Sequence, residues 1–254
     1  MSLPKPYFRI YRPFKSNSNS NDKMEYIIDA DYCSERLDLV RYYSILENEL
    51  LDIFKYIEPD NLSTYSIKNY QLLTNICIEV ENNLSSIINA NQYTSNNDLT
   101  MTDYRKLDRH MRLSEYEIKM NVYKYSIDFK PFYYNSKSFS EKKPDWYTAY
   151  NSVKHERTKN IHQATLKNVI HSLGGLYVIL YAQFAAYSSN GSDCLITWKN
   201  LYMGQFNKQN FIPIFEIIKE PLWQEDEKYD FDWDLLKLLS TSDRFQKLNI
   251  WMNT

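Results

Sequence analysis

Apolar residues recur every three or four positions along most of this chain, which is the spacing of helices that bury one face. The first such seam predicts a helix that begins at about Ser34 and ends before Pro59. A second seam predicts a helix that begins at about Ser63. The seams contain Leu39, Tyr43, Leu46, Leu50, Ile53 and Ile57 in the first helix, and Tyr70, Leu73, Cys77, Val80, Leu84 and Ile87 in the second. Two long helices with a short connection are typical of an antiparallel pair.

The second half of the chain predicts another helical pair. Lys143-Pro144-Asp145 predicts a helix start, because proline is favoured in the first turn of a helix. A long apolar helix is expected from about Ile161 to Tyr187, with a seam at Leu166, Val169, Leu173, Leu176, Leu180 and Phe184. Gly174-Gly175 in this helix allows another helix to approach closely, although each glycine costs about 1 kcal/mol of helix propensity.

The remaining segments have weaker patterns. Residues 5–14 alternate weakly and predict one short strand, and Ser16–Asp22 is a low-complexity stretch that predicts a mobile loop. Residues 102–111 predict a short helix, and residues 115–134 predict irregular structure with a small hairpin. Short helices are expected at residues 210–218 and 233–239.

These patterns together predict a mainly α fold. The chain has only 4 glycines, which suits helices better than tight β-turns. We expect an N-terminal arm over residues 1–33 and a helical bundle of two antiparallel helix pairs over residues 34–188. A small β element would decorate this bundle. Residues 189–254 would form a less regular C-terminal extension packed on the bundle.

Composition limits the kinds of partner. The formal net charge is -2, so no global basic field attracts nucleic acid and any RNA site must be local. The 3 cysteines, Cys33, Cys77 and Cys194, lie far apart without a CxxC motif, which argues against a disulfide framework and a zinc site. No stretch approaches the roughly 20 apolar residues of a membrane span, and no signal peptide is evident. We therefore expect a cytoplasmic protein without a membrane partner.

Candidate chemistry concentrates between residues 151 and 162. Arg157 and His162 straddle the expected boundary between the helix that starts at Pro144 and the long apolar helix. A histidine that titrates near neutral pH can move protons, and an arginine can hold a phosphate with its planar fork. Asn151 and His155 lie one helical turn apart and share a face.

The Arg157-x4-His162 pair resembles the R-x4-6-H motif of HEPN-type helical domains, many of which are RNases or remnants of RNases. The motif covers about a dozen residues here, and the architecture covers roughly residues 34–188. The resemblance implies a homodimer in which two copies of the motif face each other and cleave RNA without a metal or cofactor. It also implies a role in defence or stress response.

Carried onto this chain, the resemblance makes Arg157 and His162 catalytic, with His155 as a competing candidate for the working histidine. Asn151, Lys154 and Lys159 would contact the substrate. The stretch from Trp146 to Arg157 is also similar to a Trp-x3-Tyr-Asn-x2-Lys-His-x-Arg stretch of uncharacterised bacterial proteins.

Several observations favour other interpretations. Arg105 and His110 match the same motif, but within one short helix a spacing of five turns the side chains apart. Thr158 follows the motif arginine, where active members often carry Asn, Asp or His. The alternative is a non-catalytic interaction module, either a degenerate HEPN domain, an antitoxin-like protein or a scaffold that binds through its C-terminal tail.

Purely structural roles are alternatives for these residues and for His171. His155 and Arg157 could cap carbonyl groups at a helix C-terminus, where cations are favoured. His171, further along the apolar helix, is interpreted as a polar position of the bundle.

Overall fold

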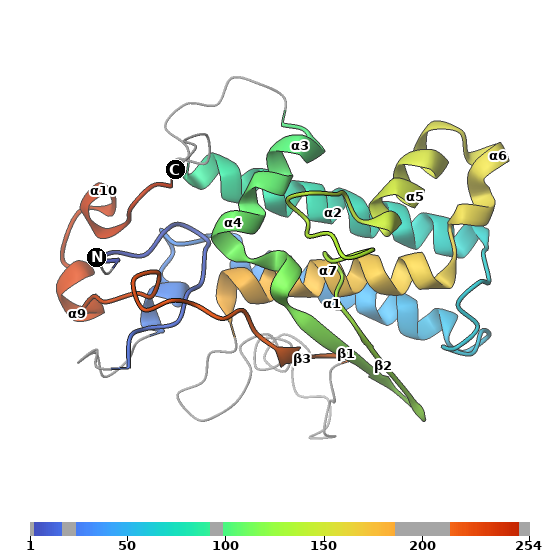
Figure 1. Cartoon of the computed structure of the whole chain (residues 1–254), viewed down its shortest axis with the longest axis horizontal. Coiled ribbons are helices and arrows are strands. Elements are labelled where there is room, and N and C mark those ends of the chain that lie inside the picture. The colour runs from blue at the N-terminus through green and yellow to red at the C-terminus, as the bar shows by residue number, and fades with distance from the viewer. Residues whose placement is uncertain (1–2, 17–23, 92–98, 186–213, 249–254) are drawn as a thin grey trace.

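The computed structural model describes residues 3–16, 24–91, 99–185 and 214–248 (Figure 1). Within these residues the chain is mainly helical, with one small antiparallel sheet of three strands. The short elements that connect the longer ones are η1 (Glu25–Ile28), α3 (Met101–Tyr104), η2 (Arg105–Leu107), α4 (Asp108–Met111) and η3 (Leu113–Glu115). Together α3, η2 and α4 occupy the segment for which a short helix was expected.

The two helices expected in the first half are α1 (Arg36–Ile53) and α2 (Ile67–Asn91). They run in opposite directions, and the end of α1 lies beside the start of α2, where Lys68 Nζ is 3.1 Å from Glu49 Oε2. Every residue of the two expected seams is buried except Leu39, Ile57 and Tyr70, which are partly buried. The apolar spacing therefore identified the faces along which these helices pack.

Helix α7 (Leu166–Phe184) lies at the centre of the molecule and packs against α1, α2 and α5 (Figure 1). Its start is held by the loop before α2, because Leu166 N donates to Thr64 O at 2.8 Å and Lys167 N donates to Leu62 O at 3.0 Å. It then runs in the same direction as α2. The helix begins later than expected, since Ile161–Gln163 form the separate 3-10 helix η4.

Helix α5 (Asp145–His155) begins after Pro144, as the sequence predicted, and packs on α2 and α7. Trp146 in its first turn is only 2% exposed, and its Nε1 donates to Pro131 O at 2.9 Å. An added Cβ at Gly175 in the middle of α7 would lie 3.1 Å from the Trp146 ring. Since its far end connects to the start of α7, α5 runs opposite to α7.

The sheet has the strand order β2-β1-β3. Strands β1 (Glu117–Val122) and β2 (Tyr125–Phe129) form the small hairpin that the sequence predicted. Strand β3 (Phe215–Lys219) pairs antiparallel with β1, with Phe215 opposite Met120 and Ile217 opposite Ile118. The expected helix at residues 210–218 is wrong over the described part, because a short apolar run adopts strand geometry when an open strand edge is available.

The sheet approaches α7 closely at Gly174. An added Cβ would lie 2.7 Å from Ile118 Cδ1 and 2.8 Å from Phe129 Cζ. The absence of a side chain at Gly174 and Gly175 therefore lets two different elements pack closely against α7. The hairpin of β1 and β2 lies against Gly174, and Trp146 of α5 lies against Gly175.

The strand expected over residues 5–14 does not form, and this prediction is wrong. The described part of the arm makes only single bridges, Leu3 to Tyr229, Tyr7 to Gln246 and Phe14 to Tyr229. Pro4, Pro6 and Pro13 lack the N–H that a regular ladder requires. Arg9 has a φ of 55°, which turns the chain locally. The polar stretch Ser16–Asp22 lies outside the described residues apart from Ser16.

An aromatic cluster joins the N-terminal arm to the C-terminal part of the chain. Tyr26 and Tyr229 are fully buried, with ring centroids 5.8 Å apart in an edge-on arrangement. The Tyr229 hydroxyl donates to Ile10 O at 2.8 Å. Phe231 and Trp233 complete the cluster at the start of α9 (Trp233–Leu236), which lies within an expected helix, and α10 (Thr241–Arg244) follows. The two ends of the chain thus share one core.

A buried polar network connects this arm to the helices. Arg9 is 5% exposed, and its Nε donates to Gln183 Oε1 at 2.8 Å. Gln183 Nε2 in turn donates to Asn83 Oδ1 at 3.1 Å, and Asn83 Nδ2 donates to Glu79 O at 2.9 Å. Glu35 Oε2 lies 3.9 Å from Arg9 Nη1. The network ties the arm to α2 and α7 near the ends of both helices.

We expect Gly174→Ala to destabilise the protein by about 1–3 kcal/mol, because the added methyl overlaps the hairpin side chains more than the better helix propensity compensates. Gly175→Ala is the matched control, since its closest neighbour is the edge of a single ring and the expected cost is smaller. Urea unfolding of the two variants measures the difference. Equal stability of both would contradict the close contact of the sheet at Gly174.

We expect Gln183→Leu to lower the free energy of unfolding by about 2–4 kcal/mol, since it leaves Arg9 and Asn83 buried without their partner. The double variant Arg9→Met, Gln183→Leu should lose less than the sum of the two single variants. The free energies of unfolding of the wild type, the two single variants and the double variant, measured with denaturant, form a double-mutant cycle. Additive losses would show that the two side chains do not depend on each other.

Candidate functional site

The residues predicted to carry chemistry lie on a corner made of the end of α5, α6 (Arg157–Asn160) and η4, which we call the α5–α6 corner (Figure 1). Glu156 has φ -144° and ψ 71°, and this non-helical conformation separates α5 from α6. Asn160 stabilises the turn, because its Nδ2 donates to Ser152 O at 3.0 Å. The expected polar break between two helices is therefore a compact folded turn.

Arg157 is the first residue of α6, and its side chain is exposed. The guanidinium carbon lies 5.8 Å from the ring centroid of Tyr70 on α2. Contacts of this kind at exposed sites contribute about 0.5–1 kcal/mol and leave the edge of the guanidinium open. Within the part of the chain that the structure describes, Arg157 has no ion pair, so its N–H groups can donate hydrogen bonds to an anion.

The two candidate histidines are both exposed. His155 ends α5, and His162 lies in η4. Neither side chain forms a hydrogen bond with the described residues. His155 and Arg157 were considered as caps for carbonyl groups at the end of α5. The side chain that caps a carbonyl there is that of Asn160, which donates to Ser152 O. Both histidines are therefore open to solvent and to a ligand.

The three expected substrate-binding residues differ in how available they are. Lys154 Nζ lies 5.1 Å from the ring centroid of Tyr150, and Lys154 remains exposed. Lys159 forms an ion pair with Glu156, which partly neutralises its charge. Asn151 is half-buried on α5, one turn before His155. The structure thus places all six predicted residues on one corner, with Lys154 and Arg157 as the cations that carry no carboxylate partner among the described residues.

Arg105 and His110, the second match of the motif, have structural roles. Arg105 Nε donates to Phe139 O at 3.0 Å, and its guanidinium also contacts Ser140 O. His110 is partly buried, and burial lowers its pKa from 6.5 to about 4. The carbonyl of His110 accepts a hydrogen bond from Arg12 Nη2 at 3.2 Å. Arg105 and His110 therefore do not form a site, and the α5–α6 corner is the exposed copy of the motif.

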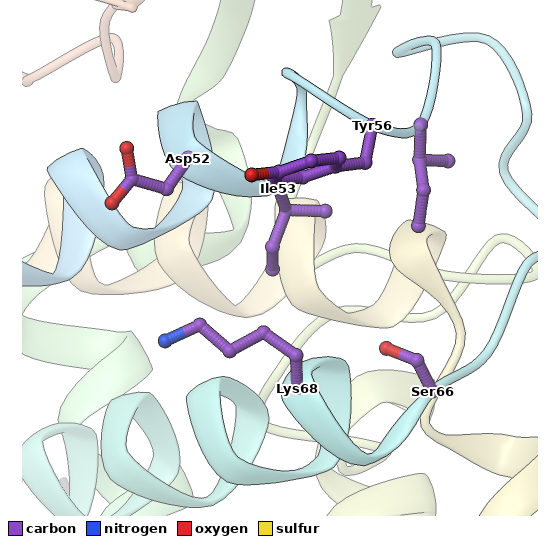
Figure 2. A pocket seen from close by; sticks show the side chains of 6 residues that line it. Asp52, Ile53, Tyr56, Ser66 and Lys68 are labelled. Atoms are coloured by element: carbon purple, nitrogen blue, oxygen red, sulfur yellow. The ribbon is translucent and has the colours of Figure 1, made fainter.

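Neither of the two pockets described for this structure is lined by a residue of the α5–α6 corner. The first, of about 360 Å³, lies between the end of α1 and the start of α2. Figure 2 shows Asp52, Ile53 and Tyr56 on one side of this pocket and Ser66 and Lys68 on the other. Its charged residues are already in ion pairs, Asp52 with Lys55 and Lys68 with Glu49. The pocket offers an apolar surface without reactive groups.

The second pocket, of about 220 Å³, was not expected from the sequence. We call it the His171 pocket; it lies between the start of α7, the start of α5 and residues 129–134. His171 was interpreted as a polar position of the bundle, but its ring stacks on Phe129 at 4.3 Å and lines this pocket. The available signal was the spacing of Lys167, Asn168 and His171 on one helical face, opposite the aromatic run that follows Lys130.

Comparisons with known proteins give no family to which this chain can be assigned. No protein-family model matches the sequence, and no curated protein or solved structure is significantly similar to it. The function must therefore be argued from the residues and the geometry.

Two further features limit the chemistry within the described residues. No group of three or more His, Cys, Asp and Glu side chains in these residues could hold a metal ion. None of their helices is long and apolar enough to cross a membrane.

The neutral histidines predict how stability depends on pH. Burial lowers the pKa of His171 from 6.5 to about 4, as it does for His110. The unfolded chain therefore binds protons more readily, and these two residues destabilise the fold as the pH falls from about 6.5 to about 4. We expect His171→Phe, which keeps a ring against Phe129, to lose less stability over this range than the wild type in thermal unfolding followed by circular dichroism. A parallel decline of both proteins would contradict a neutral His171.

Proposed function

We propose that this chain is an RNA-directed protein that contacts RNA through the α5–α6 corner and acts as a metal-independent endoribonuclease. The observation that supports this most directly is the exposure of Arg157, His155 and His162 on one short segment, with the guanidinium of Arg157 not paired to any described carboxylate. A surface on which two histidines form no hydrogen bond and an arginine forms no ion pair with the described residues is suited to a polyanion.

The proposed chemistry needs no metal, because RNA carries its own nucleophile. One histidine takes the proton of the 2′-hydroxyl, or protonates the leaving 5′-oxygen, while Arg157 stabilises the charge that develops on the phosphate. The bond from phosphorus to the 5′-oxygen breaks as the bond to the 2′-oxygen forms. The products are a 2′,3′-cyclic phosphate and a 5′-hydroxyl.

No residue of the corner lines either of the two described pockets. We propose that two copies face each other at this corner in a homodimer, as the HEPN resemblance implies. Each copy would then bring one Arg157 and one pair of histidines to a shared site. The antiparallel pairing of α1 with α2 and of α5 with α7 is compatible with the HEPN arrangement. A role in defence or stress response remains an implication of the resemblance.

A non-catalytic interaction module is the second candidate. It is favoured by Thr158, which follows the motif arginine, and by the apolar pocket between α1 and α2 (Figure 2). Tyr56 at this pocket is 89% exposed, so its ring is accessible to a partner. A protein partner at that end of the molecule would leave the α5–α6 corner without a function.

We expect the wild-type protein to cleave mixed RNA in EDTA and to leave 2′,3′-cyclic phosphate ends. Arg157→Ala and one of the two variants His155→Ala and His162→Ala should reduce the rate by about 100-fold or more, since each removes a group that acts in the transition state. Gel analysis of the fragments and of their ends gives both the rate and the chemistry. The histidine whose loss abolishes cleavage is the working one.

Arg109→Ala is the matched control, because Arg109 is an exposed arginine of α4 outside the corner. Cleavage that survives both histidine substitutions would exclude the proposed site. Wild-type protein that binds a partner protein but never cleaves RNA would favour the interaction module. Light scattering on the same samples measures the mass, and a monomer that cleaves at the full rate would contradict the dimer.

A further inference from the structure

The His171 pocket contains polar groups that form no hydrogen bond with the described residues. His171 lies one helical turn after Asn168 and Lys167, so the three side chains share one face of α7. The imidazole of His171 forms no hydrogen bond with any described residue, and its stacking on Phe129 holds the ring in one plane at an interplanar angle of 25°. A neutral imidazole presents one N–H donor and one nitrogen acceptor. Both are available to a ligand in this pocket.

Asn168 adds a second acceptor beside this ring. Its Nδ2 donates to Gln163 O at 2.8 Å, which fixes the amide and leaves Oδ1 without a partner among the described residues. A donor and two acceptors held in place on one helical face match the edge of a planar heterocycle. An apolar ligand would leave these groups desolvated and unpaired, at a cost of about 1–3 kcal/mol for each.

Two lysines and one carboxylate are the charged residues that line the pocket. Lys167 is exposed and forms no ion pair with the described residues, while Lys130 lies 4.0 Å from Glu117. Asp145, the acidic residue of the lining, is paired with Lys142 at 3.1 Å. A cationic ligand is therefore disfavoured, and an acidic substituent can approach Lys167.

The start of α7 does not itself offer an anion site. The amides of Leu166 and Lys167 donate to Thr64 O and Leu62 O, and the amide of Asn168 donates to Thr165 Oγ1 at 3.3 Å. Recognition of an acidic group would thus depend on a side chain, and Lys167 is the one placed for it. Size sets a further limit, because the pocket of about 220 Å³ is smaller than the roughly 300–1,000 Å³ of most ligand sites. It can enclose a planar ring but not a sugar and phosphate as well.

We propose that the His171 pocket binds the base of a nucleotide, with the edge of the base against His171 and Asn168 and the phosphate outside at Lys167. This site shares no residue with the α5–α6 corner and is therefore independent of the proposed cleavage. The nucleotide could be a free mononucleotide or one residue of an RNA strand. Thr165, which lines the pocket, is three residues after His162, so at most about 11 Å separates their Cα atoms.

Titration of the full chain with AMP, GMP, CMP and UMP tests this site by calorimetry, or by fluorescence because Trp146 lines the pocket. We expect at least one of the four to bind below about 1 mM. His171→Phe should weaken that binding about tenfold, since the ring remains but its donor and acceptor are lost. Lys167→Gln should weaken binding of the nucleotide about threefold or more and leave binding of the corresponding nucleoside unchanged. Lys219→Gln, at the exposed end of β3 and outside both sites, is the matched control and should bind as the wild type does.

A short RNA oligonucleotide forms the second arm and distinguishes the two sources. Binding of the oligonucleotide alone, weakened by His171→Phe and by Lys167→Gln, assigns the pocket to one residue of an RNA strand. No binding of either ligand up to about 5 mM overturns the proposal, as does binding that both substitutions leave unchanged. If His171→Phe does not fold, Lys167→Gln at the exposed rim decides by itself. RNA cleavage that fails while nucleotide binding persists would disprove the proposed function and leave this site intact.

Discussion

Beyond its first two turns, helix α7 is buried on every face, and the rest of the structure is arranged to cover it. Every residue from Ser172 to Phe184 is buried. A helix that is apolar on all sides is covered by neighbours when it lies in the core of a fold. The helices α1, α2 and α5 cover part of its surface, and the hairpin of β1 and β2 covers the side at Gly174. The single amide in this stretch, Gln183, requires Arg9 and Asn83 as partners, which brings the N-terminal arm into the core.

The two candidate sites lie at different positions relative to the buried part of α7. The α5–α6 corner lies before α7 begins, where the chain turns around Glu156 and packs little. Its two histidines are therefore exposed and form no hydrogen bond with the described residues, and Arg157 forms no ion pair with them. The His171 pocket lies where the first turns of α7 emerge from the core, so its polar groups are held rigidly but still reach solvent. One site is suited to a polymer on a surface, and the other to a small planar group.

Much of the fold followed from apolar spacing. The seams of α1 and α2, the start of α5 after Pro144 and the hairpin near residues 117–129 are local patterns, and each forms where it was expected. The strand over residues 5–14 and the helix over residues 210–218 failed because their structure depends on a partner. The arm contains prolines that prevent a ladder, and β3 forms because β1 offers it an edge. These segments pair with residues that lie about 100 or more positions away, and the local spacing of apolar residues cannot predict such pairing.

The sequence by itself determined which residues face the core, where the long helices lie, and that Arg157 and His162 stand at a helix junction. It did so because the period of apolar residues and the turn chemistry of proline are local properties. Only the tertiary structure decided which copy of the Arg-x4-His pattern is exposed, since the loop at Phe139 and Ser140 engages Arg105 and nothing engages Arg157 in an ion pair among the described residues. Only the tertiary structure also shows that His171 lines a pocket, because Phe129 and α5 contact this part of α7 from distant parts of the chain.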